Sequence, residues 1–93
     1  MEISEVRIFL VRGEEEKLKA YANITIDNTF VVTGLRIVNG EKGLFVSYPS
    51  RRMADGTYKD IAHPLDNTTR RIIEDRVLAA YTAKLKEPPA PST

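Results

Sequence analysis

Basic side chains gather at two places where the chain is free to present them to an anion. Arg51 and Arg52 follow Pro49, which lacks a backbone donor and ends regular strand pairing, so we expect both on a loop. Arg70 and Arg71 fall in the first turn of a predicted helix, where free amide groups also favour anions. The planar guanidinium group suits phosphate and guanine edges. Phosphate contact, and hence nucleic-acid binding, is the chemistry that these residues predict.

Each of these cations also has an ordinary structural explanation. The first arginine pair can be a solvated turn, and the second can pair with acidic residues at helical spacing. Lys59, on a strand beside the arginine loop, either widens the basic patch or is an ordinary surface lysine. The predicted nucleic-acid-binding residues are Arg51, Arg52, Lys59, Arg70 and Arg71.

The side chains that common catalytic and metal sites require are missing from the sequence. The chain has no cysteine and a single histidine, His63, so neither a thiolate metal site nor a histidine-based triad can form. No phosphate-cradling glycine loop, paired-carboxylate site or nucleophile elbow is visible. We therefore expect no enzyme, no catalytic residue, no metal, no cofactor and no small-molecule substrate, and we interpret His63 as structural.

The tyrosines offer a weaker signal. Stacking on single-stranded bases requires aromatic rings on one solvent-exposed face. Tyr21 and Tyr58 are the two that qualify by position, although packing in the core or in a dimer is the preferred interpretation for all four.

Alternating apolar residues predict the strands that must position these groups. Apolar residues at every second position of 17–27 predict a strand with one buried face, and Thr33-Gly34 marks a bulge in the next strand. Asp55-Gly56 is a strong turn signal between the last two strands, which we expect to pair as a hairpin with a cationic tip. The expected strands are Ile3–Arg12, Lys17–Asp27, Thr29–Asn39, Leu44–Tyr48 and Tyr58–Ala62.

A C-terminal helix is predicted from about Thr68 to Lys86, after several residues that can cap its first amides. Its apolar stripe comprises Ile73, Val77, Ala80, Tyr81 and Leu85. The fold class is therefore α+β: an antiparallel sheet of about five strands with one C-terminal helix packed on it. We expect a single domain over residues 1–86 and a disordered, proline-rich tail over 87–93.

Size and charge limit the possible partners. A chain of 93 residues is marginally stable alone, and one helix leaves part of a sheet face uncovered, so a homodimer on that face or on a sheet edge is expected. Phe9, Val11, Val31 and Phe45 are the apolar residues expected to stay uncovered.

Net charge is only +1, but residues 51–86 carry eight basic and five acidic side chains. Without an apolar run long enough for a membrane span or a signal peptide, we expect no membrane association and a cytoplasmic location.

The block PSRR–DG–Y–DIAHP, followed by Thr69-Arg70, resembles the SpoVG family of small septation and sporulation regulators. The resemblance runs from about Met1 to Lys86. It implies a small α+β fold, a homodimer, and sequence-selective DNA binding, with RNA binding as well. Arg51, Arg52 and Arg70 match the basic positions of the family block, whereas Arg71 lies outside it.

Two functions from different classes follow. One is a homodimeric nucleic-acid-binding regulator, in which pairing doubles the basic surface. The other is a protein–protein adaptor of the septation machinery that acts through an apolar or edge-strand surface without touching nucleic acid.

Overall fold

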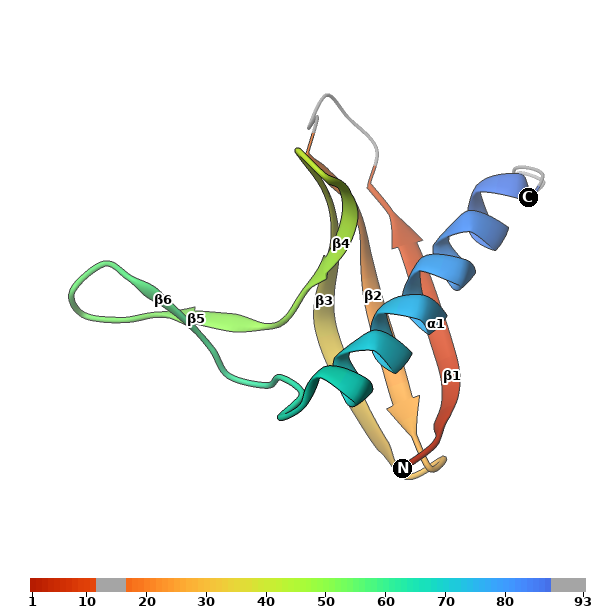
Figure 1. Cartoon of the computed structure of the whole chain (residues 1–93), viewed down its shortest axis with the longest axis horizontal. Helices are drawn as coiled ribbons and strands as arrows, with labels where there is room; N and C mark the ends of the chain where they lie inside the picture. Colours follow the sequence, from red (N-terminus) through yellow and green to blue (C-terminus); the bar gives the residue numbers. More distant parts are fainter. Residues whose placement is uncertain (12–16, 88–93) are drawn as a thin grey trace, which may run out of the picture.

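The computed structural model, which describes residues 1–11 and 17–87, has a four-stranded antiparallel sheet with one helix across one face (Figure 1). The strands follow one another in the order β1-β2-β3-β4, and two further strands, β5 and β6, form a separate two-stranded sheet. The predicted α+β class is confirmed. The bounds are β1 Ile3–Leu10, β2 Leu18–Ile26, β3 Phe30–Gly40, β4 Gly43–Ser47, β5 Ser50–Arg52, β6 Tyr58–Asp60 and α1 Asn67–Lys86.

The alternation of β2 decides which face of the sheet is buried. Ala20, Ala22 and Ile24 are at most 2% exposed and lie under the helix. Strand β3 keeps its apolar residues on the same face only by means of a bulge, because Ala22 pairs with Leu35 while Ile24 pairs with Val32. Gly34, within the bulge, has a φ of +81°. The predicted bulge is confirmed, and it restores the inward phase of the second half of β3.

Helix α1 begins directly after a capping residue, Asp66. The Asp66 carboxylate accepts a hydrogen bond from the Thr69 amide at 2.6 Å, as an N-cap residue does. Of the predicted stripe, Ile73, Val77 and Tyr81 are buried and Ala80 packs against the core. Leu85 is 56% exposed, so its inclusion in the stripe was wrong: the helix extends past the sheet there (Figure 1).

The predicted hairpin of Leu44–Tyr48 with Tyr58–Ala62 was wrong in its pairing. Strand β4 pairs with β3, and β6 pairs with β5, a strand that begins directly after Pro49. Proline ends the ladder of β4, but the chain resumes extended pairing one residue later. The main sheet therefore has four strands, and the last two project from it as a narrow arm, which we call the ribbon (residues 50–60; Figure 1).

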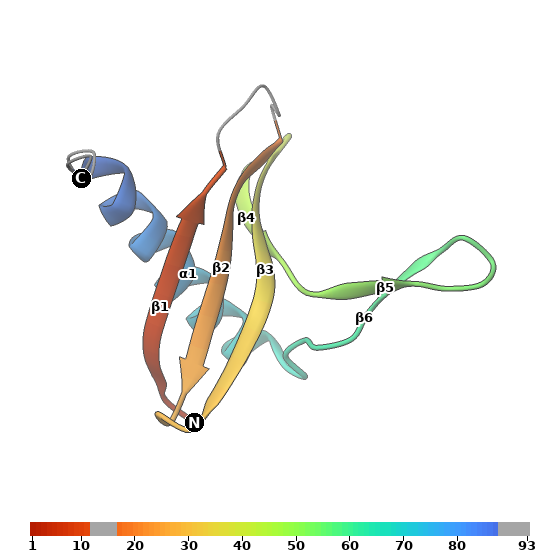
Figure 2. The same ribbon diagram turned by 180° about the vertical axis from the view of Figure 1, so that it is seen from behind.

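The opposite face of the sheet carries no helix (Figure 2), and we call it the open face. Of the four residues expected to stay uncovered, Phe9, Val31 and Phe45 are exposed and Val11 is partly buried.

A second apolar area, the helix-start patch (Met1, Phe30, Pro64 and Leu65), lies where α1 begins. Met1 and Pro64 line a hollow there that reaches Ile24 and Val32. Phe30 is 64% exposed and Leu65 93%.

Two predictions fall partly on residues that the structure does not describe. Glu87 closes α1 with an extended backbone, and the rest of the predicted disordered tail, 88–93, lies outside the described residues, as does Arg12 of the first predicted strand. In the described part of the chain, no helix combines the length and apolar character needed to cross a membrane.

Candidate nucleic-acid interface

The ribbon is held together by its turn. The Met53 amide donates to the Thr57 carbonyl at 2.7 Å, and the Gly56 amide donates to the Met53 carbonyl at 3.0 Å. Gly56 has a φ of +89°, which suits glycine. The Asp55 carboxylate accepts hydrogen bonds from the Thr57 hydroxyl and amide, and these bonds lower the pKa of Asp55. The turn predicted from Asp55-Gly56 is confirmed.

Strand pairing places the ribbon's cations on two faces. Arg51 lies directly opposite Lys59, and Arg52 directly opposite Tyr58. Because side chains alternate along a strand, Arg51 and Lys59 share one face while Arg52 and Tyr58 share the other. The prediction that both arginines lie on a loop was wrong: they are strand residues, and their side chains leave the ribbon in opposite directions.

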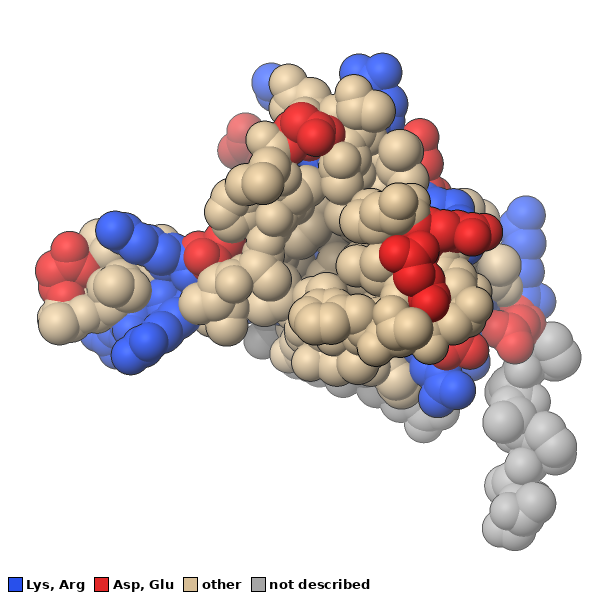
Figure 3. All heavy atoms as spheres, turned by 90° about the horizontal axis from the view of Figure 1, so that it is seen from below, with Lys and Arg blue, Asp and Glu red and all other residues tan. Residues whose placement is uncertain are grey.

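Among the described residues, no carboxylate forms an ion pair with any of the five predicted binding residues. In residues 1–11 and 17–87 the ion pairs are Arg7–Glu5 at 3.1 Å and Lys84–Glu87 at 3.7 Å. The helix arginines, Arg70 and Arg71, therefore form no ion pair with Asp66, Glu74 or Asp75, which was the alternative explanation for them. Figure 3 shows Lys and Arg atoms on both sides of the ribbon, which stands apart from the rest of the molecule.

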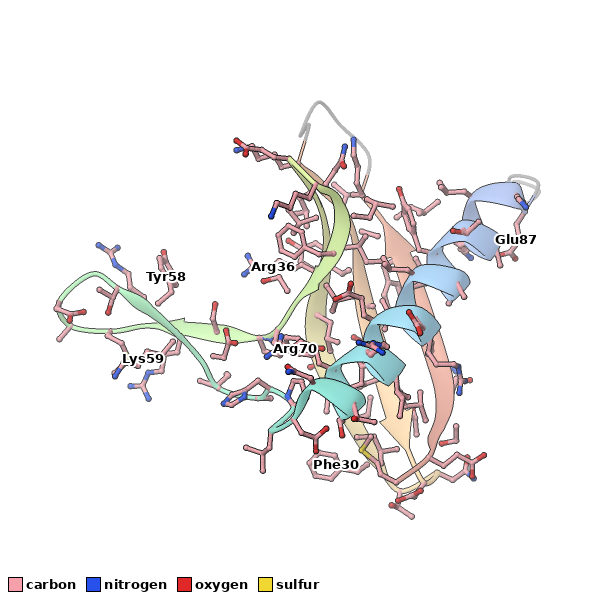
Figure 4. All side chains as sticks on the ribbon, in the orientation of Figure 1. Phe30, Arg36, Tyr58, Lys59, Arg70 and Glu87 are labelled. Carbon is pink, nitrogen blue, oxygen red and sulfur yellow. The ribbon has the colours of Figure 1, made fainter. Side chains whose placement is uncertain are left out.

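Arg70, in the first turn of α1, lies at the base of the ribbon near β4 (Figure 4). Its guanidinium carbon is 5.3 Å from the ring centroid of Tyr48, a cation–π distance. Tyr48 is 5% exposed and immediately precedes Pro49, where the chain leaves the sheet. Burial raises the pKa of the Tyr48 hydroxyl, and the nearby charge of Arg70 opposes that shift. One helix cation is therefore held beside the root of the ribbon.

Arg71 has different surroundings. It shares a shallow hollow with Asn67, Arg70, Glu74 and Asp75, so acidic side chains border it. The first helical turn itself contains no acidic residue. The structure thus groups Arg51, Arg52 and Lys59 on the ribbon with Arg70 at its base, and leaves Arg71 on the helix surface.

Sequence reasoning missed Arg36. It lies on the open face, directly between Tyr21 of β2 and Ser47 of β4. Leu35 and Ile37 on either side of it are fully buried, so their alternation did indicate an outward Arg36. Arg36 lies near Tyr21 and the ribbon because of the strand register, and alternation within one strand cannot predict that register.

His63 lies beside the helix-start hollow rather than in the core. Its ring is exposed, and Nδ1 is 2.9 Å from the Pro64 carbonyl oxygen. No group of three or more metal-ligating side chains occurs within the described ranges.

Comparison with known proteins gives one consistent result. The family model SpoVG matches residues 1–83. A protein of Anaeromyxobacter sp. strain Fw109-5 is 52% identical over 91 residues, covering 98% of this chain and 92% of the relative. One of Archaeoglobus fulgidus is 54% identical over 80 residues (86% and 93%), and one of Bdellovibrio bacteriovorus 49% over 86 (92% and 78%). All three carry the name "Putative septation protein SpoVG".

Proposed function

This chain belongs to the SpoVG family, and from that premise and the geometry of the ribbon we propose that it is a homodimeric nucleic-acid-binding regulator. Its ligand is DNA bound with sequence selectivity, with RNA as a second ligand class. The process it serves is the septation that its relatives' names give. It acts by binding and not as an enzyme.

One observation carries the proposal. Arg51 and Lys59 are directly opposite on an exposed strand pair, and like charges in that position destabilise it. No carboxylate in the described ranges pairs with either residue to offset this repulsion. A phosphate group between them would, because it accepts hydrogen bonds from both and cancels their charge. Arg70 of α1, at the base of the ribbon, extends this cationic surface onto the helix.

The second copy binds through the helix-start patch. This patch combines an apolar hollow at Met1 and Pro64 with the strongly exposed side chains of Phe30 and Leu65, which is unusual for a small monomer. Burying the patch in a dimer would offset the small size of the core. Pairing there leaves both ribbons free, and a two-fold axis would repeat them at a fixed separation.

The test measures affinity for a random-sequence DNA pool as a function of salt. If each protomer neutralises about three phosphates, log K falls against log salt with a slope of about −5. The Arg51→Ala/Arg52→Ala double variant removes four of the dimer's charges, so its slope flattens to about −2. Arg76→Ala/Lys86→Ala, which removes the same charge from exposed helix positions, keeps the original slope.

A salt-independent affinity, or an unchanged slope in the ribbon double variant with an intact circular dichroism spectrum, contradicts the proposal. Selection of bound sequences from the pool at two salt concentrations then separates sequence-selective binding from purely electrostatic binding.

A second function is favoured by the exposed apolar surface together with the relatives' names: an adaptor of the septation machinery. In that case Arg51→Ala/Arg52→Ala keeps partner binding, whereas Leu65→Glu loses it. A pull-down from cell extract that survives nuclease treatment supports the adaptor, and one that nuclease abolishes supports the regulator.

A further inference from the structure

One row of side chains crosses the open face from edge to edge. The register pairs Phe9 with Tyr21, Tyr21 with Arg36, and Arg36 with Ser47. These four residues therefore lie side by side on the face that no helix covers (Figure 2). Directly paired side chains are about 4.5–5.5 Å apart at Cβ, so the row spans roughly 15 Å. Phe9 is 49% exposed and Tyr21 43%, so two of its members present aromatic surface to solvent.

The ribbon closes one end of this row. A hollow between the open face and the ribbon is lined by Tyr21, Arg36 and Ser47 from the sheet, and by Ser50, Tyr58 and Asp60 from the ribbon. Figure 4 shows Arg36 and Tyr58 projecting into the angle between ribbon and sheet, while Lys59 projects from the ribbon's other side. Tyr58 is 68% exposed. Three strands and the ribbon thus bring two tyrosines and an arginine together in one open hollow.

We propose that the open face and this hollow bind unstacked bases of a single-stranded nucleic acid, a refinement that rests on the nucleic-acid-binding function proposed above. Tyr21 and Tyr58 stack on bases, Phe9 extends the platform, and the Arg36 guanidinium stacks or donates to a base edge. The phosphates contact Arg52 on the ribbon face that carries Tyr58, and those farther along the strand reach the Arg51–Lys59 pair on the other face.

The composition of the site favours a single strand over other occupants. Bases in a duplex are stacked on their neighbours, so only an unpaired base can offer its face to an exposed ring. The Asp60 carboxylate in the hollow repels phosphate but accepts hydrogen bonds from a base, so the base and not the backbone belongs there. If a second copy of the chain bound here, the cations of two identical surfaces would meet and repel one another. Phosphate groups instead neutralise these cations.

Anisotropy titrations with two probes test the proposal: an oligothymidylate of about 12 nucleotides, within the roughly 4–16 nucleotides of known single-strand sites, and a duplex of equal length. Tyr58→Leu and Tyr21→Leu each weaken single-strand binding about 5- to 150-fold, the value of one lost stack. Neither changes the salt slope or the affinity for the duplex. Tyr58→Phe, which keeps the ring, retains single-strand affinity, and Ile72→Ala, which removes exposed apolar surface from the helix, leaves both affinities unchanged.

A direct readout accompanies the titration. An oligonucleotide carrying 5-iodouracil cross-links to Tyr58 or Tyr21 on irradiation, and mass spectrometry identifies the modified peptide. Cross-links confined to residues outside the open face and the hollow overturn the proposal.

The outcomes distinguish failure of base stacking from failure of the proposed nucleic-acid binding. Full single-strand affinity in both leucine variants, with a salt slope that still depends on Arg51 and Arg52, overturns base stacking and leaves nucleic-acid binding standing. Failure of the wild-type protein to bind either probe overturns both. A Tyr21→Leu protein that becomes monomeric with unchanged single-strand affinity assigns the open face to self-association and overturns the inference.

Discussion

Tyr48 and Arg70 join helix α1 to the segment that leads into the ribbon. The Tyr48 hydroxyl is buried and has no hydrogen-bond partner in the described part of the chain. Tyr48→Phe therefore loses no hydrogen bond, and we expect the free energy of unfolding to change by less than about 1 kcal/mol. Tyr48→Ala removes the ring as well and costs about 3–5 kcal/mol. Urea denaturation followed by circular dichroism measures both.

Tyr48→Phe also tests the contact with Arg70. Tyr48→Phe keeps a ring beneath the guanidinium group, so nucleic-acid affinity should be retained. A loss of more than about 2 kcal/mol of stability in Tyr48→Phe would show that the hydroxyl does have a partner in the working protein.

Asp66 makes helix stability depend on pH. The hydrogen bond from the Thr69 amide, and then that from its side chain, lower the pKa of Asp66 below its ordinary 3.8. Because the folded pKa lies below the unfolded one, its stabilisation is complete above pH 3.8 and is lost as the pH falls through the folded pKa. Asp66→Ala lowers the melting temperature by about 3–8 °C at neutral pH.

Asp66→Asn is the matched control for that prediction. Asparagine caps a helix about as well as aspartate but does not titrate. Thermal melts at pH 7 and pH 3 should differ less for Asp66→Asn than for the wild type. An equal difference in the two proteins would mean that other carboxylates account for the acid sensitivity.

At the scale of elements, the ribbon and the core have separate stabilities. Every residue from Arg51 to Asp60 is exposed, so the ribbon's hydrogen bonds lack the burial that protects those of β2 and β3. Gly56→Val forces a side chain into a φ of +89° at a cost of about 1–3 kcal/mol. We expect faster amide exchange in β5 and β6, unchanged exchange in β2, and weaker nucleic-acid binding. Exchange measured by NMR would contradict this if the core amides were accelerated as well.

Packing of the helix on the sheet supplies the core's stability. Leu35 is fully buried beneath α1, in the half of β3 that the bulge turns inward. Leu35→Ala should cost about 2–5 kcal/mol of unfolding free energy, because the transfer energy is lost and a cavity remains. Leu65→Ala, at 93% exposure, should cost less than about 0.5 kcal/mol in the single chain. Urea denaturation at low protein concentration would compare the unfolding free energies of the two variants.

At the scale of the whole molecule, oligomeric state is the decisive measurement. The chain has a mass of 10.5 kDa, and we expect light scattering to give twice that value at micromolar concentration. Phe30→Glu or Leu65→Glu should yield monomers with a lower melting temperature, because pairing stabilises the fold by mass action. Phe45→Glu, on the open face, should stay dimeric.

If Phe45→Glu and Tyr21→Leu are the variants that dissociate, the two copies meet through the open face instead. The ribbon would still be available to phosphate, but the stacking surface would be covered.

Local patterns in the sequence predicted the elements of the main sheet and the helix, but not strand β5. Period-two alternation predicted strand β2, Thr33-Gly34 its partner's bulge, and the Ile73–Val77–Tyr81 stripe the buried side of α1. These features depend on residues close together in the chain, where backbone geometry and burial leave few choices. The family resemblance rested on a similarly local block and is confirmed over residues 1–83.

Only the tertiary structure decided how the elements pair and what they bring together. Pro49 signalled the end of a strand, but whether the chain then turned or began a new pair depended on contacts across the turn at Gly56. Arg51 and Arg52 consequently face opposite ways, and Arg36 meets Tyr21 through a register that alternation cannot specify. Burial has a period and can be read locally, whereas register and the angle of the ribbon are set by residues far apart in sequence.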